Sequence, residues 1–335
     1  MASNPSASKR KIIAGTPATA RPPFLGATDL RVLAKLPLAG LGAWCLPESW
    51  WDALAGHAVG LEGAAIEQLA RRITTMLGPD RLTEPARVLA RRQLAAIRVD
   101  QLCFLRSHRP GGWRPMLRLE GSEHLAAALA AGRGAILWIA PTVFQWLATK
   151  RALHEACYPV HHLSSPNHGF STASWVGTRL LNPIRTRVED RYLAERVTLG
   201  TDGSAHAALR RLTAVLRGNG IVSITVAAAG ARPVTVPFLA GSLHAAGGAP
   251  QLAARTGAPL LPVVTLREGT GFATRVEAPL ARSASGTIDP APTGLVAALA
   301  ARLEPYARAH PDQIAWRLDC IDTLPPALAG ARHPL

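Results

Sequence analysis

Residues 134–160 have the sequence GAILWIAPTVFQWLATKRALHEACYPV, in which an apolar run, a helix-like segment and a second apolar run follow one another. The run GAILWIA predicts a buried strand, VFQWLATKRALHEA has apolar residues at helical spacing, and YPV begins another strand. A strand, a helix and a strand in this order predict parallel pairing. The turn after the first strand, where α/β enzymes place functional side chains, offers no acid or base. Its side chains are Pro141, Thr142, Gln145 and Trp146.

The alternation of strands and helices continues along the chain. Further strands are predicted at 220–228, 233–240, 259–268 and 272–280, and further helices at 204–219, 246–257 and 293–311. The segment IRTRVED, residues 184–190, predicts a short strand. Continuously apolar strands between helices indicate a sheet that is covered on both faces. The expected fold class is therefore α/β, with a single mixed sheet that is largely parallel at its centre and flanked by helices.

The chain divides into four predicted parts: a disordered basic tail at 1–23, a helical segment at 24–110, the α/β domain at 111–320, and a second tail at 321–335. The helical segment contains the run LRVLAKLPLAGLGAWCLPESWW, which lysine and proline interrupt too often for it to span a bilayer. We expect it to lie against a membrane, with Trp44, Trp50 and Trp51 at the interface. An ordinary packed helical hairpin is the alternative.

Basic side chains are in excess. Lys and Arg number 37 against 22 Asp and Glu, which gives a formal net charge of +15. Such a surplus favours anionic partners. Because the chain has no zinc-finger spacing and no RNA-binding signature, we expect an anionic membrane surface or a phosphorylated ligand and no nucleic acid. A basic surface that is merely solvated is the alternative.

The four cysteines are isolated in the sequence, at positions 45, 103, 157 and 320. They form no Cys-x-x-Cys pair, so a disulfide framework and a zinc site are not expected, and no other metal motif is present. Isolated cysteines favour a reducing compartment.

Four segments, in the same order along the chain, resemble one protein family: RGAILWIA, YPV, VTVPFLAG with GAPQLAARTGAPLLPV, and AHPDQIAWR. The last matches a His-Pro-acid-Gln-x-x-Trp ending, with His310, Pro311, Asp312, Gln313 and Trp316 in place. The chain is similar to the bacterial late lipid A acyltransferases and the wider lysophospholipid acyltransferase superfamily.

That resemblance implies an acyltransferase-like α/β fold and a role in lipid biosynthesis. The reaction that it implies moves a fatty acyl group from an acyl carrier protein (acyl-ACP) or acyl-CoA thioester to a hydroxyl or amine of a lipid or glycan. The thioester is then a co-substrate, and no further cofactor is expected. The implied location is cytoplasmic, peripheral on the inner face of the cell membrane.

The catalytic signature of the family is absent. It consists of a His after the first core strand, four residues of any kind, and then an Asp or Glu, with the His as general base. Alignment on the neighbouring segments puts Thr142 and Leu147 at these positions, and a shift by one residue gives Pro141 and Trp146. The chain is therefore either an acyltransferase with a non-standard site or an inactive homologue that binds lipid or supports a partner.

A substitute base is offered by HHLSSPNHGFS, which follows the second core strand. His168 paired with Asp190 or Glu189 would replace the missing pair. Arg185, Arg187 and Arg191 would hold the phosphates of the donor or acceptor. The remaining predicted substrate-binding residues are Thr142, Gln145, Ser165 and Asn167. In the alternative interpretation His168 shapes a turn, Thr142 caps a helix, and the charged run is a solvated ion-pair network.

Overall fold

The computed structural model describes residues 23–170, 174–199, 205–228, 233–280 and 292–324. Its centre is a seven-stranded sheet with the order β1-β9-β8-β2-β5-β3-β4. All pairs are parallel except the antiparallel β8–β9 pair. The strands are β1 Leu117–Glu120, β2 Ala135–Ile139, β3 Val160–Ser164, β4 Glu195–Thr198, β5 Ile221–Thr225, β8 Leu260–Glu268 and β9 Gly271–Val276. The expected α/β class and the parallel centre of the sheet are confirmed.

Both faces of the central strand β2 are covered. Ile136 and Trp138 belong to one apolar cluster, together with residues of α8 (Ala205–Arg217) and α9 (Gly248–Thr256). Ala135, Leu137 and Ile139 point the other way, into a cluster with residues of α5 (Ser122–Ala130) and α6 (Ala148–Glu155). Because side chains alternate along a strand, a strand between two helical layers needs apolar residues at every position. This explains the continuous run in GAILWIA.

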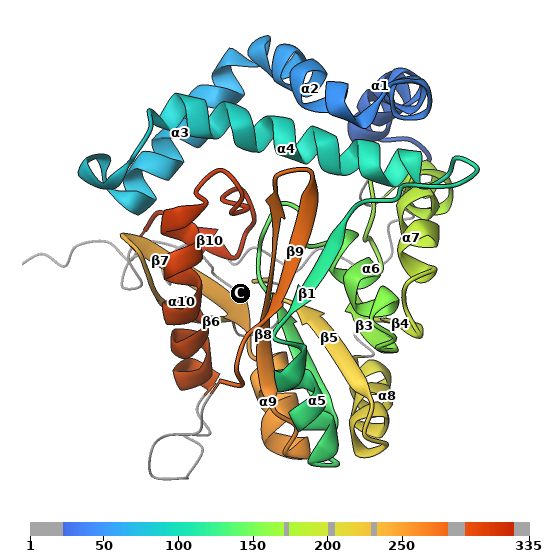
Figure 1. Cartoon of the computed structure of the whole chain (residues 1–335), viewed down its shortest axis with the longest axis vertical. Helices are drawn as coiled ribbons and strands as arrows, with labels where there is room; N and C mark the ends of the chain where they lie inside the picture. Colours follow the sequence, from blue (N-terminus) through green and yellow to red (C-terminus); the bar gives the residue numbers. More distant parts are fainter. Residues whose placement is uncertain (1–22, 171–173, 200–204, 229–232, 281–291, 325–335) are drawn as a thin grey trace, which may run out of the picture.

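Four helices form a layer across one end of the sheet (Figure 1). They are α1 (Ala27–Cys45), α2 (Trp51–Gly60), α3 (Gly63–Leu77) and α4 (Ala86–Arg106). The helix α4 packs against each of the other three. Trp51 is 2% exposed and packs in the apolar cluster between these helices, so its expected place at an interface is wrong. Trp44 and Trp50 are exposed.

A second, three-stranded antiparallel sheet has the order β10-β7-β6 and packs against α10 (Pro292–Ala309). Its strands are β6 (Pro233–Phe238), β7 (Gly241–Ala246) and β10 (Ile321–Asp322). Gly241 lies so close to β10 that a Cβ atom there would stand 2.1 Å from the Asp322 carbonyl oxygen. The predicted tail at 321–335 thus begins with a paired strand, and residues 325–335 lie outside the described part, as do residues 1–22 of the predicted N-terminal tail.

The predicted strand at 184–190 is wrong, because this segment lies in helix α7 (Asn182–Asp190). Over so short a segment, the alternation of apolar and polar side chains fits the period of a helix as well as that of a strand. Pro183 in the first helical turn and the Arg185–Glu189 pair, four residues apart, favour the helix. A π-helical turn, Gly177–Leu181, leads into it.

The helix expected from Val143 is shorter than predicted, since residues 143–147 form turns and α6 begins at Ala148. None of the helices in the described ranges combines the length and the apolar character that a bilayer crossing requires.

Candidate active site

The loop that follows β2 is held by the C-terminal segment that carries the His-Pro-acid-Gln-x-x-Trp ending. Thr142 forms an isolated antiparallel bridge with Ile314. The Val143 amide donates to the Gln313 carbonyl at 2.9 Å, and the Ala315 amide donates to the Pro141 carbonyl at 2.9 Å. The loop is therefore fixed through its backbone, which leaves its side chains available to line a cavity.

Two side chains of this ending fix the segment itself. The Gln313 amide bonds the backbone of Arg267 in β8 twice: its Oε1 accepts from the Arg267 amide at 2.7 Å, and its Nε2 donates to the Arg267 carbonyl at 3.0 Å. The Trp316 indole is fully buried and donates to the Pro311 carbonyl at 2.6 Å. In this chain the ending therefore has a structural role, because it ties the site loop to the sheet.

A cavity of about 170 Å³ lies beside this loop, between α4, α7 and the C-terminal segment. Among the described residues, five buried side-chain atoms on its lining residues have no hydrogen-bond partner. They are Gln93 Oε1, Thr142 Oγ1, Gln145 Oε1, Gln145 Nε2 and Arg185 Nη2. Buried polar atoms are almost always paired. The cavity is therefore lined by polar atoms that can bond a polar group placed in it.

Asp100, from α4, is the carboxyl group of this cavity. Its side chain is 10% exposed, and its Oδ2 lies 3.6 Å from Arg185 Nη2. Burial raises the pKa of Asp100 to about 7, although Arg185 opposes the rise. A carboxyl group with a pKa near neutrality can accept a proton at physiological pH. The sequence interpretation missed Asp100, because it lies inside a long amphipathic helix among alternating arginines.

His168 and Glu189 lie together. His168 Nε2 is 2.8 Å from Glu189 Oε1, so of the two predicted partners the structure selects Glu189. Asp190 instead pairs with Arg196 at 2.6 Å and is exposed, so the His168–Asp190 alternative is wrong. Gly169 permits the arrangement, since its φ is +153° and a Cβ atom there would stand 2.4 Å from the Asn182 side chain. The catalytic role of the pair stays a prediction.

Glu189 is the centre of a buried ion cluster. Its side chain is fully buried and accepts hydrogen bonds from Lys150 Nζ at 3.0 Å, Arg196 Nη2 at 2.9 Å and Arg185 Nε at 3.3 Å. Burial alone would raise the pKa of Glu189, but Lys150, His168 and Arg185 outweigh it and hold this pKa well below its ordinary value. Glu189 is therefore ionised and satisfied by its neighbours.

The His168 ring is separated from the cavity by its neighbours. Trp146 lines the cavity and its ring lies 4.9 Å from the ring of His168, which is not itself a lining residue. Burial lowers the pKa of His168 and favours the neutral ring. Arg185 contacts both Glu189 and Asp100, so the histidine is linked to the cavity through Glu189 and this arginine.

The predicted substrate-binding residues fall into two groups, those that line the cavity and those that do not. Thr142, Gln145 and Arg185 line the cavity. Four others do not: Ser165, Asn167, Arg187 and Arg191 are exposed. The Ser165 carbonyl accepts from the His168 amide, and Arg191 Nη1 donates to the Ser107 carbonyl. The predicted substrate-binding role of these four residues stays a prediction.

The largely parallel sheet defines an α/β protein, and the polar cavity lies at the carboxyl end of its central strand, where such folds place their sites. The family model of the bacterial lipid A biosynthesis acyltransferases matches residues 94–319, which is more than half of the chain. The chain therefore belongs to this family, and membership supports an acyltransferase-type function. None of the curated proteins matches it significantly.

Proposed function

We propose that the protein transfers an acyl group from a thioester, acyl-ACP or acyl-CoA, to a hydroxyl or amine of a lipid or glycan. The observation that carries this proposal is the cavity with its orphaned polar atoms, located where the family has its catalytic histidine. At about 170 Å³ the cavity is smaller than pockets that enclose a whole ligand. It suits the thioester carbonyl and the attacking group, with the acyl chain outside.

The proposed reaction is a direct displacement in which the ionised Asp100 acts as the base. Asp100 takes the proton of the acceptor hydroxyl or amine, whose oxygen or nitrogen forms a bond to the thioester carbon. The resulting oxyanion accepts hydrogen bonds from the Thr142 hydroxyl and the Gln145 amide, and Arg185 supplies positive charge. When the C–S bond breaks, the proton passes from Asp100 to the leaving thiolate. This assignment replaces His168, the candidate from sequence, because Asp100 lines the cavity and His168 does not.

The test is incubation of the purified protein with acyl-ACP or acyl-CoA and a total lipid extract, followed by mass spectrometry. Acylated lipid or glycan that accumulates with time and with enzyme concentration is the expected result. Hydrolysis of the thioester alone, without an acylated product, would contradict transfer.

A second candidate is an inactive homologue that binds lipid or supports a partner enzyme. It is favoured by the replacement of the family's catalytic pair by Thr142 and Leu147, a hydroxyl without a hydrogen-bond partner and a fully buried apolar side chain. This candidate predicts lipid that co-purifies with the protein and no turnover of any thioester.

The proposed location of the protein is cytoplasmic and peripheral, at an anionic membrane surface. Helix α1 exposes a row of large apolar side chains: Leu30, Leu33, Leu38, Leu41 and Trp44. Such a helix would lie in the headgroup region while the net charge of +15 attracts anionic lipid. An acyl chain that leaves the small cavity would then find an apolar surface close to α4, against which α1 packs.

A further inference from the structure

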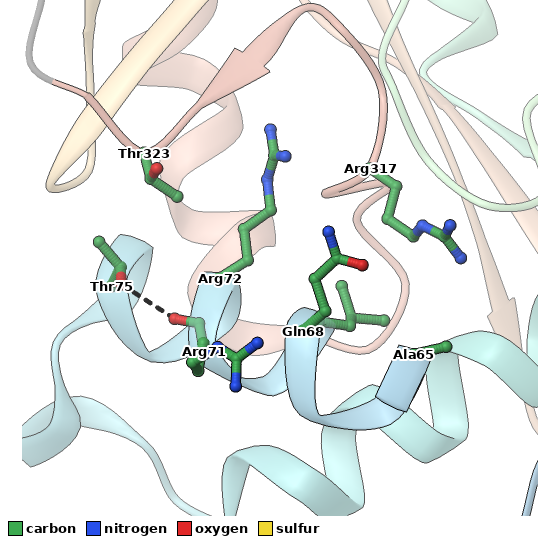
Figure 2. Close-up of a pocket in the computed structure, with 8 residues that line it drawn as sticks. Ala65, Gln68, Arg71, Arg72, Thr75, Arg317 and Thr323 are labelled. Carbon is green, nitrogen blue, oxygen red and sulfur yellow. Dashed lines mark hydrogen bonds between the residues drawn. The ribbon is translucent and has the colours of Figure 1, made fainter. Parts of the chain in front are cut away.

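A second cavity, of about 440 Å³, lies between α3 and the C-terminal segment. Figure 2 shows Arg72 and Gln68 on α3, with Arg72 extending toward the segment that carries Thr323 and Arg317. The lining residues are Ala65, Gln68, Leu69, Arg71, Arg72, Thr75, Arg317 and Thr323. Three of these eight side chains are arginines and none is acidic, so the cavity is a site of positive charge.

The three arginines have no carboxylate in direct contact among the described residues. Within the described part of the chain, Arg71, Arg72 and Arg317 form no salt bridge. Arg72 donates to the Ile321 carbonyl, and its buried Nε has no partner there. Asp319 and Asp322 act on Arg72 from a distance only, and one Asp322 oxygen already accepts from the Leu324 amide. Guanidinium groups without a paired carboxylate are suited to a phosphate.

The two cavities share a wall. Arg317 lines the 440 Å³ cavity and also the 170 Å³ cavity that contains Asp100 and Thr142. The two cavities are therefore neighbours, as a substrate with its reactive group in the smaller one and a charged group in the larger one requires. Arg71 and Arg72 precede residue 94, where the match to the family begins, whereas Arg317 lies within the matched region.

We propose that the cavity between α3 and the C-terminal segment binds a phosphate ester group of a substrate, which it positions for reaction in the adjacent cavity. The role in reaction rests on the proposed acyl transfer, whereas the binding itself does not. Two substrates carry such a group: the donor, through the phosphates of CoA or of the phosphopantetheine arm, and an acceptor that is a phosphorylated lipid.

The experiment measures binding by isothermal titration, without turnover, to the full-length protein. The ligands are CoA, as the donor probe, and dihexanoyl phosphatidic acid, as a monomeric acceptor probe. The variant Arg71→Gln/Arg317→Gln removes two exposed guanidinium groups, and its folding is checked by thermal melting. The control Arg210→Gln/Arg217→Gln removes the same charge from exposed positions on α8, at the far end of the sheet (Figure 1).

We expect the first variant to bind at least one ligand about tenfold more weakly than the control does. Weaker binding of CoA alone assigns the site to the donor, and weaker binding of the phosphatidic acid alone assigns it to the acceptor. Equal binding by both variants, or no binding of either ligand by the unaltered protein, overturns the proposal. If the first variant binds a ligand more weakly than the control but the unaltered protein transfers no acyl group, the proposed function is refuted and the phosphate site remains supported.

Discussion

Asp100 and His168 differ in what surrounds them, and this difference decides which of them can meet a substrate. Among the described residues, Asp100 forms a salt bridge with Arg185 alone, at 3.6 Å, and its carboxyl lines a cavity. His168 has Nε2 committed to Glu189, which three cations also bind. A base needs access to the proton that it removes. We therefore assign proton transfer to Asp100, and to His168 a role in the ion cluster that holds Arg185.

The substitution Asp100→Asn keeps the size of the side chain and removes its basicity. We expect acyl transfer to fall by about 100-fold or more. In the unaltered protein the rate should rise with pH through about 7, because Asp100 accepts a proton only when it is ionised. The charged groups that act on the Asp100 carboxyl are Arg185, Glu189 and Lys150. His168→Gln should cost less than about tenfold. Initial rates between pH 5.5 and 8.5 provide the measurement, and a larger loss in the histidine variant would return the base to His168.

The pH dependence of stability gives a second test of the raised pKa, through the Asp100→Asn variant. A carboxyl pKa raised to about 7 in the folded state means that the folded chain binds more protons than the unfolded chain between about pH 4 and 7. Stability from this group is therefore present at low pH and lost as the pH rises through 7. Relative to the unaltered protein, the variant should gain on the order of 3 kcal/mol between pH 4 and pH 8. Urea denaturation at both pH values tests this, and a constant difference would refute the raised pKa.

Thr142→Val removes a buried hydroxyl that has no hydrogen-bond partner among the described residues. Because an unsatisfied buried hydroxyl is costly, we expect stability to rise by about 1 kcal/mol. Transfer should fall by about 100-fold, since an oxyanion donor is lost. The control is Thr213→Val, whose hydroxyl bonds the Leu209 carbonyl at 2.8 Å, and which should lose stability. A stability loss at Thr142 equal to that at Thr213 would show that its hydroxyl is satisfied.

At the scale of elements, α7 brings the Glu189 carboxylate to four partners: Arg185 of α7 itself, and Lys150, His168 and Arg196 from three other parts of the chain. Glu189→Gln would leave Lys150 buried without a carboxylate partner among the described residues, and Arg185 and Arg196 would each lose one of two carboxylate partners. Breaking a buried ion cluster in this way should destabilise the protein by about 3–5 kcal/mol. Glu155→Gln breaks the partly exposed pair with Arg151 and should cost less than about 1 kcal/mol. Thermal melting of both variants at pH 7 is the measurement, and equal melting temperatures would contradict the buried cluster.

The sequence predicts long, strongly patterned elements well and short ones poorly. GAILWIA and SAHAALRRLTAVLRGN correspond to β2 and α8, because continuous apolarity and helical spacing are unambiguous over that length. The strand predicted at IRTRVED is a helix, and β4 and β7 were not predicted. The strand β7, GSLHAA, pairs with the preceding strand β6 in a hairpin and also with β10, which comes from a distant part of the chain. The distant pairing leaves no local pattern.

The site is predictable only where its residues follow a strand. The order of strands identifies the segments that follow β2 and β3, and these segments contain Thr142, Gln145 and His168. Glu189 lies in α7, which precedes β4. Asp100 and Gln93 reach the cavity because α4 lies across the end of the sheet (Figure 1). That placement depends on tertiary packing. A single aspartate on an amphipathic helix carries no signal of it in the sequence.

At the scale of the whole molecule, the N-terminal helices connect three features: the cavity with Asp100, the cavity with Arg72 and the exposed apolar face of α1. The helix α4 lines the first cavity, α3 lines the second, and α1 packs on α4. This arrangement suits a substrate whose phosphate, reacting group and acyl chain must reach different surroundings. Of these N-terminal helices, α1, α2 and α3 precede the matched family region, and α4 runs into it.

Membrane binding is the prediction that belongs to the whole molecule. Leu38 and Leu41 on α1 are 76% and 62% exposed, and burying each in lipid should be favourable by about 2 kcal/mol. The variant Leu38→Asp/Leu41→Asp should therefore bind anionic vesicles at least tenfold more weakly in a flotation assay. The control Ala126→Asp/Ala254→Asp adds the same charge at exposed positions on α5 and α9, at the opposite end of the sheet (Figure 1). If charge alone drives binding, both variants weaken it equally and salt abolishes it. If α1 inserts, only the first variant loses binding, and a salt-resistant fraction remains in the control.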